Sequence, residues 1–413
     1  MLNHKIMKRQ NFAYTFLLLA FALFSCNEAP TPLGFSLVQD TVELYAINSF
    51  ELHLIEKEET YFLPLNYVNP GFSLIGEANG YKSGVVIRFS GIPDTLTYVT
   101  ENDIIECALN LQPERYALGD TLGSNYLSFS VYENTSMWVI ETSAEDFFQK
   151  KFQKHTPMST FSGSVPRKDT MDKIIVDFDK ALLLDWFKKQ AEKKDTIWGI
   201  SIIPNSDSKI ISQFYGSGSH PRLAPFVRVI FNNTKSNKVD TLYLESAMEK
   251  NFSITDNKLD DNRLTLLGAI CYKPRLSFDI SSIPKFAGIH KAELHLPIDR
   301  SKCFSANVSL DTIIRLDYFE NETDEINKKS PKYYYYGIRN TGNDVFKVYS
   351  LTSLLSYWNR NTGKGSLSVN FENSTSQYRL NKFSFYTSNE PDSTKRPKLI
   401  VIYSVLKKKI NIR

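Results

Sequence analysis

The sequence predicts an all-β protein made of two tandem antiparallel β-sandwich domains of jelly-roll-like form, each with one short helix. Three observations support this fold class. The chain has 413 residues, of which 42% are hydrophobic, enough for two ordinary cores. Short runs of alternating apolar and polar residues recur between turn signals, as in strands with one buried face. The same series of signals appears twice, about 185 residues apart.

The first 25 residues have the composition of a secretory signal peptide. Lys5, Lys8 and Arg9 form a positive end, and residues 12–24 are almost wholly apolar. This apolar run is shorter than the roughly 20 residues that a helix needs to cross a bilayer. We therefore expect the segment to be cleaved rather than retained as a membrane span.

Cys26 is the predicted site of lipid attachment, followed by a tether over residues 26–39. The residues Leu23-Phe24-Ser25-Cys26 resemble the bacterial lipobox, in which the cysteine is lipidated and becomes N-terminal. Acyl chains there would anchor the protein, because each buried CH₂ contributes about 0.8 kcal/mol. The resemblance implies a lipid anchor in the outer membrane, facing the periplasm or the cell surface. The alternative is an ordinary secreted protein.

The charge of the chain argues against a nucleic-acid partner. The formal net charge is +4, and cleavage of the leader removes three positive charges, which leaves about +1. Binding to nucleic-acid phosphates needs a concentrated basic face. A nearly neutral body offers no such face.

The strand pattern repeats in order along the two halves. Residues 87–93 and 276–284 each alternate and then reach a proline, as a strand entering a turn does. Residues 104–111 and 289–296 follow. In each run every second residue is apolar, beginning at Cys107 and at Ala292, which lie 185 residues apart. A further strand ends at Asn134 in the first half and at Asn321 in the second.

Each half then carries one amphipathic helix. Ser350 is the expected N-cap of the second helix, and the first helix is expected to start near Asp179. The residues that share the apolar stripe of the two helices are Leu183, Trp186 and Phe187 in the first, and Leu351, Leu354, Leu355 and Trp358 in the second. We therefore expect Trp186 and Trp358 to be core residues rather than ligand platforms. Trp138 and Trp198, in strand-like runs, are also expected in the core.

The domain boundaries follow from the closing strands of the two halves, residues 225–231 and 397–403. The polar segment 232–239 lacks periodicity, which is typical of a linker. The prediction is a first domain over residues 40–231, a second over residues 240–404 and a basic tail over residues 405–413. Lys407, Lys408 and Lys409 in this tail are expected in solvent, with contact to a membrane surface as the alternative.

The second half also resembles a known family. Residues 276–284, then Ala292-Glu293-Leu294-His295-Leu296, Trp358 and the closing run 396–403 are similar to the DNRLRE domain and to carbohydrate-binding module family 96. The first half is similar more loosely, and Asp261-Asn262-Arg263-Leu264 matches only the start of the name motif. The resemblance implies a β-sandwich of secreted and surface proteins, with polysaccharide binding in some members. It does not imply catalysis.

A run of four tyrosines, residues 333–336, is the predicted ligand site. Sugar-binding proteins stack an aromatic face on the sugar ring and hydrogen-bond its hydroxyls with polar side chains. Two of the four must face away from the core whatever the register. We expect Tyr334, Tyr336 and Arg339 to contact a glycan. The alternative is an edge strand whose outward tyrosines merely cover the sheet.

Cysteines and acidic residues give weaker indications. Cys107 is expected in the core, whereas Cys271 and Cys303 either pair or remain free. The cluster Asp256, Asn257, Asp260 and Asp261 could hold a hard cation, but the expected form is a solvated turn because the spacing is not that of an EF-hand. We expect no metal and no cofactor.

Catalysis finds little support in the sequence. Motifs such as GxSxG, HExxH or a phosphate-binding glycine loop are absent. His290 and His295 lie five residues apart on one expected strand, so opposite faces are predicted. A carboxylate pair for glycoside cleavage depends on spatial distance and stays open. The sequence thus predicts a lipid-anchored envelope protein that binds polysaccharide. The alternative is a non-catalytic structural or assembly lipoprotein that docks other envelope proteins.

Overall fold

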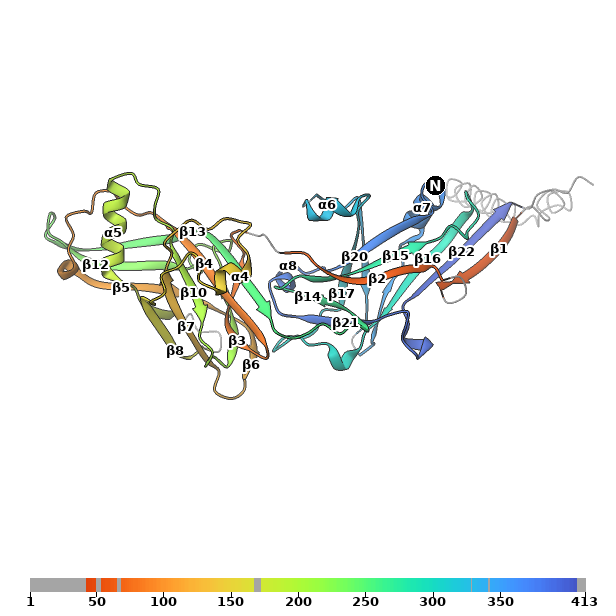
Figure 1. The fold of residues 1–413 in the computed structure, drawn as a ribbon, viewed down its shortest axis with the longest axis horizontal. Coiled ribbons are helices and arrows are strands. Elements are labelled where there is room, and N and C mark those ends of the chain that lie inside the picture. Colours follow the sequence, from red (N-terminus) through yellow and green to blue (C-terminus); the bar gives the residue numbers. More distant parts are fainter. Residues whose placement is uncertain are drawn as a thin grey trace, which may run out of the picture.

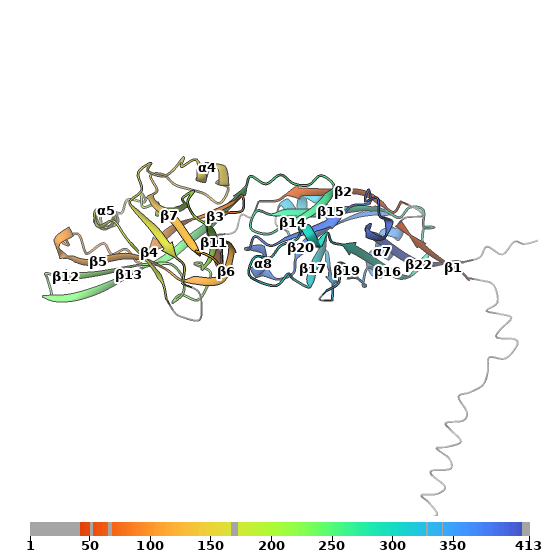
Figure 2. The ribbon, with the colours of Figure 1, turned by 90° about the horizontal axis from the view of Figure 1, so that it is seen from below.

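The computed structural model describes residues 42–49, 53–64, 68–166, 172–327, 329–340 and 342–406. In these residues the chain forms two antiparallel sandwiches that lie end to end along the molecule (Figures 1 and 2). The predicted all-β fold with two sandwich domains is confirmed. The expected signal peptide, Cys26, the tether and the lysines of the tail lie outside the described residues. No helix of the described part has the length and apolar character needed to cross a membrane.

The first sandwich is one sheet of eleven strands folded over its own core. The order is β6-β11-β3-β4-β13-β12-β5-β9, while β10 joins β4 to β7 and β7 pairs with β8. The strands are β3 (Phe72–Ala78), β4 (Tyr81–Ser90), β5 (Ile104–Leu111), β6 (Pro113–Gly119), β7 (Tyr126–Glu133), β8 (Ser159–Ser164), β9 (Ile174–Asp177), β10 (Ile200–Pro204), β11 (Ile210–Tyr215), β12 (Phe226–Asn233) and β13 (Lys238–Thr255).

The second sandwich has the same number of strands, in the order β1-β22-β16-β19-β18-β17-β20-β15-β14-β21, with β2 also paired to β15. The strands are β1 (Val42–Asn48), β2 (Ile55–Phe62), β14 (Arg263–Leu267), β15 (Tyr272–Asp279), β16 (Gly288–Pro297), β17 (Ile313–Tyr318), β18 (Tyr333–Ile338), β19 (Val345–Val348), β20 (Lys364–Phe371), β21 (Lys382–Tyr386) and β22 (Lys398–Leu406).

The first two strands of the described residues belong to the second sandwich. β1 pairs with β22, from Val42 opposite Leu406 to Asn48 opposite Ile400, and β2 pairs with β15. β13 instead pairs with β12 and β4 of the first sandwich. The predicted boundaries, 40–231 and 240–404, are therefore wrong. The first sandwich comprises residues 72–255, and the second comprises residues 42–62 together with 263–406.

The predicted linker is the reason for this difference. Residues 232–239 form the end of a hairpin, in which Asn233 lies opposite Lys238 and residues 234–237 make the turn. Closing a short turn costs little chain entropy, so β13 returns along β12 at once instead of starting a new domain. β13 then pairs with β4 of the first sandwich, as β2 pairs with β15 of the second.

Corresponding bulges show that β2 and β13 occupy equivalent places. In β2 the register shifts at Glu56, opposite Phe278, and in β13 it shifts at Ala247, opposite Phe89. Phe278 and Phe89 lie in the matching strands β15 and β4. The chain is thus a duplication in which the start of each repeat, β1 and β2 in the first and β13 in the second, lies in the other sandwich.

A second pair of bulges corrects the prediction for the histidines. In β16 the register shifts at His290, between Ile289 and Lys291. In β5 it shifts at Ile105, which is the residue equivalent to His290. The extra residue reverses the alternation, so Ile289 and Ala292 are both buried. His290 and His295 therefore lie on the same outward side of the strand, where His290 contacts Ser404 at 2.7 Å.

The helices are short and more numerous than predicted. α5 (Lys180–Ala191) begins at Asp179, whose carboxylate accepts a bond from the backbone N–H of Leu182 at 3.1 Å. α7 (Thr352–Arg360) has Leu351 at its N-cap position, so the expected cap at Ser350 is wrong. Leu351 is fully buried, and its packing holds this end in place of a capping hydroxyl. The other helical segments are α4 (Ala144–Phe148), α6 (Glu322–Ile326), α8 (Ser374–Gln377), η1 (Glu101–Asp103), η2 (Arg300–Lys302) and η3 (Ser393–Lys395).

Each core is built around the tryptophan of its helix. Trp186 packs against Phe89 and Phe178, and Trp358 packs against Phe278 and Tyr318. Both indoles are buried, as predicted.

The other two tryptophans lie outside strands. Trp138 is buried, in agreement with the prediction. Trp198 is only half-buried and has the Arg88 guanidinium 5.7 Å from its ring centroid. Its expected place in the core is therefore corrected, because one face of the indole is covered by a charged side chain instead of by apolar residues.

Candidate functional site

The predicted tyrosines lie on the outer face of the second sandwich. Tyr334 and Tyr336 are 56% and 43% exposed, whereas Tyr335 between them is 9% exposed and belongs to the core. The ring centroids of Tyr334 and Tyr336 are 5.7 Å apart, with the ring planes at 69°. The strand alternation thus turns both rings outward side by side, as the period of two requires.

Polar side chains from the two neighbouring strands lie beside these rings. In the ladder between β18 and β17, Tyr334 is opposite Asp317 and Tyr336 is opposite Arg315. Asn370 of β20 is in turn opposite Arg315. We call the outer surface formed by Tyr334, Tyr336, Arg315, Asp317 and Asn370 the tyrosine face.

Asp317 is the buried centre of this polar group. Its carboxylate oxygens lie 2.9 Å from the Arg315 guanidinium and accept a bond from Asn370 Nδ2, also at 2.9 Å. Burial raises the pKa of Asp317, and the bonds from Arg315 offset part of that effect. The Arg315 side chain remains 33% exposed. It is therefore held in place from below while it faces solvent.

Glu325 of α6 forms a second polar cluster farther along the same side of the sheet. Its carboxylate accepts bonds from the Tyr61 hydroxyl at 2.6 Å and from the Ser368 hydroxyl at 2.8 Å. Lys273 lies 3.0 Å and Arg275 3.5 Å from the same carboxylate. Burial alone would raise the pKa of Glu325, but the charge of Lys273 and the hydrogen bonds outweigh it, so the pKa is held below its usual value. This cluster fixes α6 to the sheet and ties β2 to the second sandwich.

Arg339 does not join the tyrosine face. Arg339 follows Tyr335 and Gly337 at intervals of two residues, so it faces inward as they do. Only 5% of the residue is exposed. Its guanidinium donates to the carbonyl oxygens of Leu310, Asp311 and Asn343 at 3.2–3.3 Å. The expected contact between Arg339 and a ligand beside the tyrosines is therefore wrong, because its odd spacing from Tyr334 and Tyr336 turns it to the opposite side of the sheet.

The first sandwich has no aromatic residue at the corresponding positions. Thr160 and Ser162 of β8 lie opposite Ser130 and Ser128 of β7, in the places of Tyr334 and Tyr336. The hydroxyls of these serine and threonine pairs are 3.2 and 3.3 Å apart. The two sandwiches share a framework, but only the second presents an aromatic surface on it.

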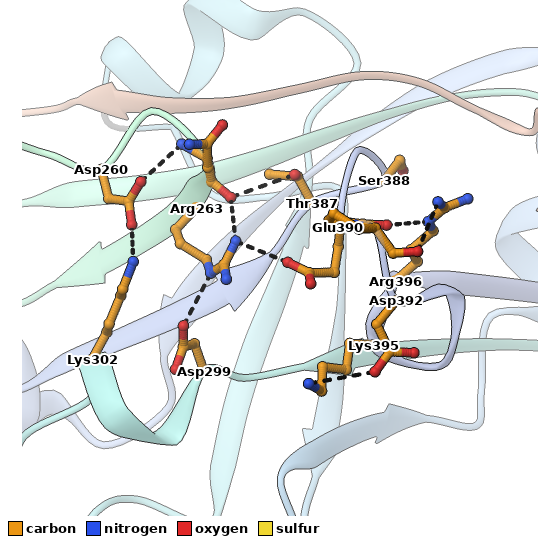
Figure 3. Close-up of polar contacts among 12 residues, drawn as sticks. Asp260, Arg263, Asp299, Lys302, Thr387, Ser388, Glu390, Asp392, Lys395 and Arg396 are labelled. Carbon is orange, nitrogen blue, oxygen red and sulfur yellow. Dashed lines mark hydrogen bonds and ion pairs between the residues drawn. The ribbon is translucent and has the colours of Figure 1, made fainter.

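Arg263 holds neighbouring loops together. It lies in the segment Asp261-Asn262-Arg263-Leu264, which resembles the first four residues of the DNRLRE motif. Its guanidinium lies 3.2 Å from Asp299 and 3.1 Å from Glu390 (Figure 3). It also covers the Tyr386 ring, 4.3 Å from the ring centroid. A cavity of about 560 Å³ opens beside this cluster, between β2 and the loops around residues 260 and 388. The charges around Arg263 are mutually satisfied, which indicates a structural role.

The acidic turn beside Arg263 does not form a cation site. Asp260 pairs with Lys302 (Figure 3). The Asn257 side chain donates to the carbonyl oxygen of Asn79 at 2.9 Å. Within the described ranges, no group of three or more histidine, cysteine, aspartate or glutamate residues is arranged to hold a metal ion.

The three cysteines of the described body are free thiols. Cys107 is buried in the core, as predicted. Cys271 and Cys303 do not form a disulfide with each other, which settles the alternative left by the sequence.

Arg315, Asp317 and Asn370 were not identified from the sequence. A signal was present, because Arg315-Leu316-Asp317 places opposite charges on one face of a strand-like run. No protein-family model matches the chain, and no curated protein matches it.

Proposed function

We propose that this protein is a lipid-anchored component of the cell envelope that binds a polysaccharide on the tyrosine face of its second sandwich. The binding is proposed without a catalytic step. The observation that carries the proposal is the contrast between the two sandwiches. At equivalent positions the first has Thr160 and Ser162, and the second has Tyr334 and Tyr336.

The chemistry of the tyrosine face supports a sugar ligand. A sugar ring has apolar C–H faces that stack on aromatic rings and hydroxyls that need hydrogen-bond partners. Tyr334 and Tyr336 supply the rings, and the half-exposed Arg315, held by Asp317, supplies donors at a fixed position. The resemblance to the DNRLRE domain adds the expectation that members of this kind bind polysaccharide.

The test is glycan binding by the soluble chain that starts at Asn27. The double variant Tyr334→Ala/Tyr336→Ala is expected to lose binding at least tenfold, because removal of each stacking ring costs about 1 kcal/mol. The matched control is Thr160→Ala/Ser162→Ala, which changes the equivalent face of the first sandwich and should bind normally. Replacement of both tyrosines by phenylalanine keeps the rings and should keep most of the affinity. Unchanged binding by the alanine pair would rule out this face.

Exposed isoleucines favour a second candidate function. Ile313 and Ile338 lie opposite each other on the same side of the sheet and are 37% and 48% exposed. They extend the apolar surface beyond the two tyrosines, which suits contact with another envelope protein. If cross-linking from this face captures an envelope protein in a way that Ile338→Ser abolishes, and no glycan binds, the docking function replaces the sugar-binding one.

The position of β1 supports a lipid anchor at Cys26. β1 lies at the end of the second sandwich that is farther from the first (Figures 1 and 2). Val42, Leu44 and Leu406 are exposed there, and Phe286 is exposed in the turn before β16, which pairs with the end of β22. Apolar side chains at this end suit an interface with lipid, so the first sandwich would point away from the membrane.

Vesicles test the anchor and this orientation together. The lipidated protein is expected to bind phosphatidylethanolamine–phosphatidylglycerol vesicles, and Cys26→Ser should be released from them. A fluorophore on Phe286→Cys should become shielded on vesicle binding, and one on Ser236→Cys, in the far hairpin of the first sandwich, should stay in water. Equal shielding of both labels would contradict the orientation, and retention of Cys26→Ser would contradict the anchor.

A further inference from the structure

A large cavity lies where the two sandwiches meet. It has a volume of about 1020 Å³ and is lined from the first sandwich by residues such as Asn79, Tyr81 and Leu118. The second sandwich contributes the segment around residues 300–312, Arg339 and Lys382. This volume is at the upper end of the range of small-molecule sites, which is about 300–1,000 Å³.

Contacts beside the cavity hold its two walls in one arrangement. The Asn307 side chain accepts from the backbone N–H of Ala117 at 3.0 Å and donates to the carbonyl oxygen of Arg115 at 2.5 Å. Arg379 donates to Gln213 at 3.1 Å and lies 3.4 Å from Glu114. Apolar residues of both sandwiches form a shared buried cluster behind these contacts. The cavity is therefore a built feature of the interface and not a gap between independent bodies.

The charged residues that line this cavity are all positive. They are Arg300, Arg339 and Lys382, and no aspartate or glutamate is among the lining residues. The hydrogens of Arg339 are used by backbone carbonyls, so it contributes charge to the wall and few bonds. Arg300 and Lys382 form no ion pair with any residue of the described chain, so both are available to an anion. Burial lowers the pKa of Arg339, and the nearby positive charge of Arg300 lowers it further.

Aromatic rings lie next to these cations. The ring centroids of Tyr81 and Phe304 are 5.7 Å apart, one from each sandwich. Phe304 and Lys382 are held side by side by two backbone hydrogen bonds, at 3.1 and 2.8 Å. The side chains of Asn79 and Asn257 add neutral hydrogen-bonding groups. A cavity with cations, rings and amides close together is suited to a sugar that carries a negative group.

We propose that this cavity binds an acidic saccharide, with its carboxylate or sulfate held by Arg300 and Lys382 and its ring against Phe304, which the buried Tyr81 supports from behind. The inference shares the ligand class of the proposed function but concerns a separate surface. The tyrosine face and the cavity can therefore be tested independently.

The experiment is calorimetric titration of the soluble chain with oligogalacturonate, with a sulfated oligosaccharide, with a neutral galacto-oligosaccharide and with inorganic phosphate. We expect the acidic saccharides to bind and the neutral one to bind at least tenfold more weakly. Inorganic phosphate should also bind more weakly, because it lacks the ring. Phosphate binding as tight as that of the saccharides would overturn the sugar part of the proposal. Equal binding of the neutral sugar would overturn the ionic part.

Variants locate the site. Arg300→Ala/Lys382→Ala should lower affinity for the acidic saccharide at least tenfold, which corresponds to about 1.4 kcal/mol, because both cations that would hold the anionic group are removed. Lys285→Ala/Lys291→Ala removes the same charge at the far end of the second sandwich and is the matched control. Repeating the titrations in the Tyr334→Ala/Tyr336→Ala background removes any contribution of the tyrosine face, and the difference between the Arg300/Lys382 variant and its control should persist there. Equal affinity in the Arg300/Lys382 variant and its control would exclude the cavity.

Cys303 gives a readout that does not depend on a variant. Its thiol lines the same cavity and is partly exposed. The bound saccharide should slow the alkylation of Cys303 in the otherwise unchanged chain. Alkylation at the same rate with saturating saccharide would place the ligand elsewhere.

Discussion

Glu58 of β2 and Glu249 of β13 occupy equivalent positions in the two sandwiches. Each lies at the start of a repeat whose later strands form the other sandwich. The Glu58 carboxylate accepts from the backbone N–H of Ser388 at 2.8 Å, and the Glu249 carboxylate accepts from that of Ser217 at 2.7 Å. Burial raises the pKa of both carboxyls. This geometry, shared by the two halves of one chain, shows that the exchanged strands are built into the duplicated fold.

The strand exchange predicts crossed effects of two core substitutions. Leu54, beside β2, lies in the core of the second sandwich, and Leu244 of β13 lies in that of the first; both are fully buried. Leu54→Ala should destabilise the second sandwich, and Leu244→Ala the first, each by about 2–5 kcal/mol. Hydrogen exchange at Leu276 and Val227 reports on the two cores separately. Faster hydrogen exchange at Val227 in Leu54→Ala would contradict the assignment of β2 to the second sandwich.

Glu249 predicts a stability that falls as the pH rises. It is fully buried, and burial raises its pKa to about 7. Between its unfolded value of 4.5 and about 7, the folded protein keeps a proton that the unfolded chain has released. The contribution is complete below pH 4.5 and is lost as the pH passes 7, a change of about 3 kcal/mol.

Urea unfolding between pH 5 and 8 checks this dependence. Glu249→Gln should flatten the decline, and Glu245→Gln, an exposed residue on the same strand, should leave it as in the original protein. If Glu249→Gln declines as steeply as the control, the buried carboxyl is not the source.

The ion pair between Arg315 and Asp317 predicts that removal of Arg315 lowers the stability of the protein more at pH 8 than at pH 5. Arg315→Ala leaves Asp317 buried without its cation, which should cost about 2 kcal/mol at pH 8 because Arg315 is itself partly in solvent. At pH 5 the cost should shrink, because burial already raises the pKa of Asp317 and the unpaired acid takes up a proton. Chemical denaturation at both pH values measures the difference. The double variant Arg315→Ala/Asp317→Asn should recover part of the stability lost in Arg315→Ala. If the double variant loses as much stability or more, the ion pair is not the cause.

Thiol titration should separate the three cysteines. Burial raises the pKa of Cys107 and of Cys271 to about 12. Cys303 also has a raised pKa but is only partly buried. In the folded Cys26→Ser protein at pH 8, we expect slow reaction of Cys303 with Ellman's reagent and none of the other two, and three thiols after unfolding in urea. A single thiol after unfolding would mean that Cys271 and Cys303 are paired.

Much of the local structure could be read from the residues. The alternation over residues 104–111 and 289–296 predicted strands with the correct buried parity from Cys107 and from Ala292 onward, because one face of each strand must be apolar to cover a core. The outward direction of Tyr334 and Tyr336 followed from the same period of two. The bulge at His290 could not be predicted, since the extra residue is fixed by pairing with β22.

The sequence by itself determined the class of fold, the two cores with Trp186 and Trp358 at their centres, and the outward tyrosines, because each depends on periodicity along a short stretch of chain. Only the tertiary structure decided which sandwich receives β1, β2 and β13, and that Arg315 and Asp317 accompany the tyrosines. The hydrogen bonds of a β-ladder join backbone groups that are the same in every residue, so partner strands are chosen by chain connection and by packing between distant segments.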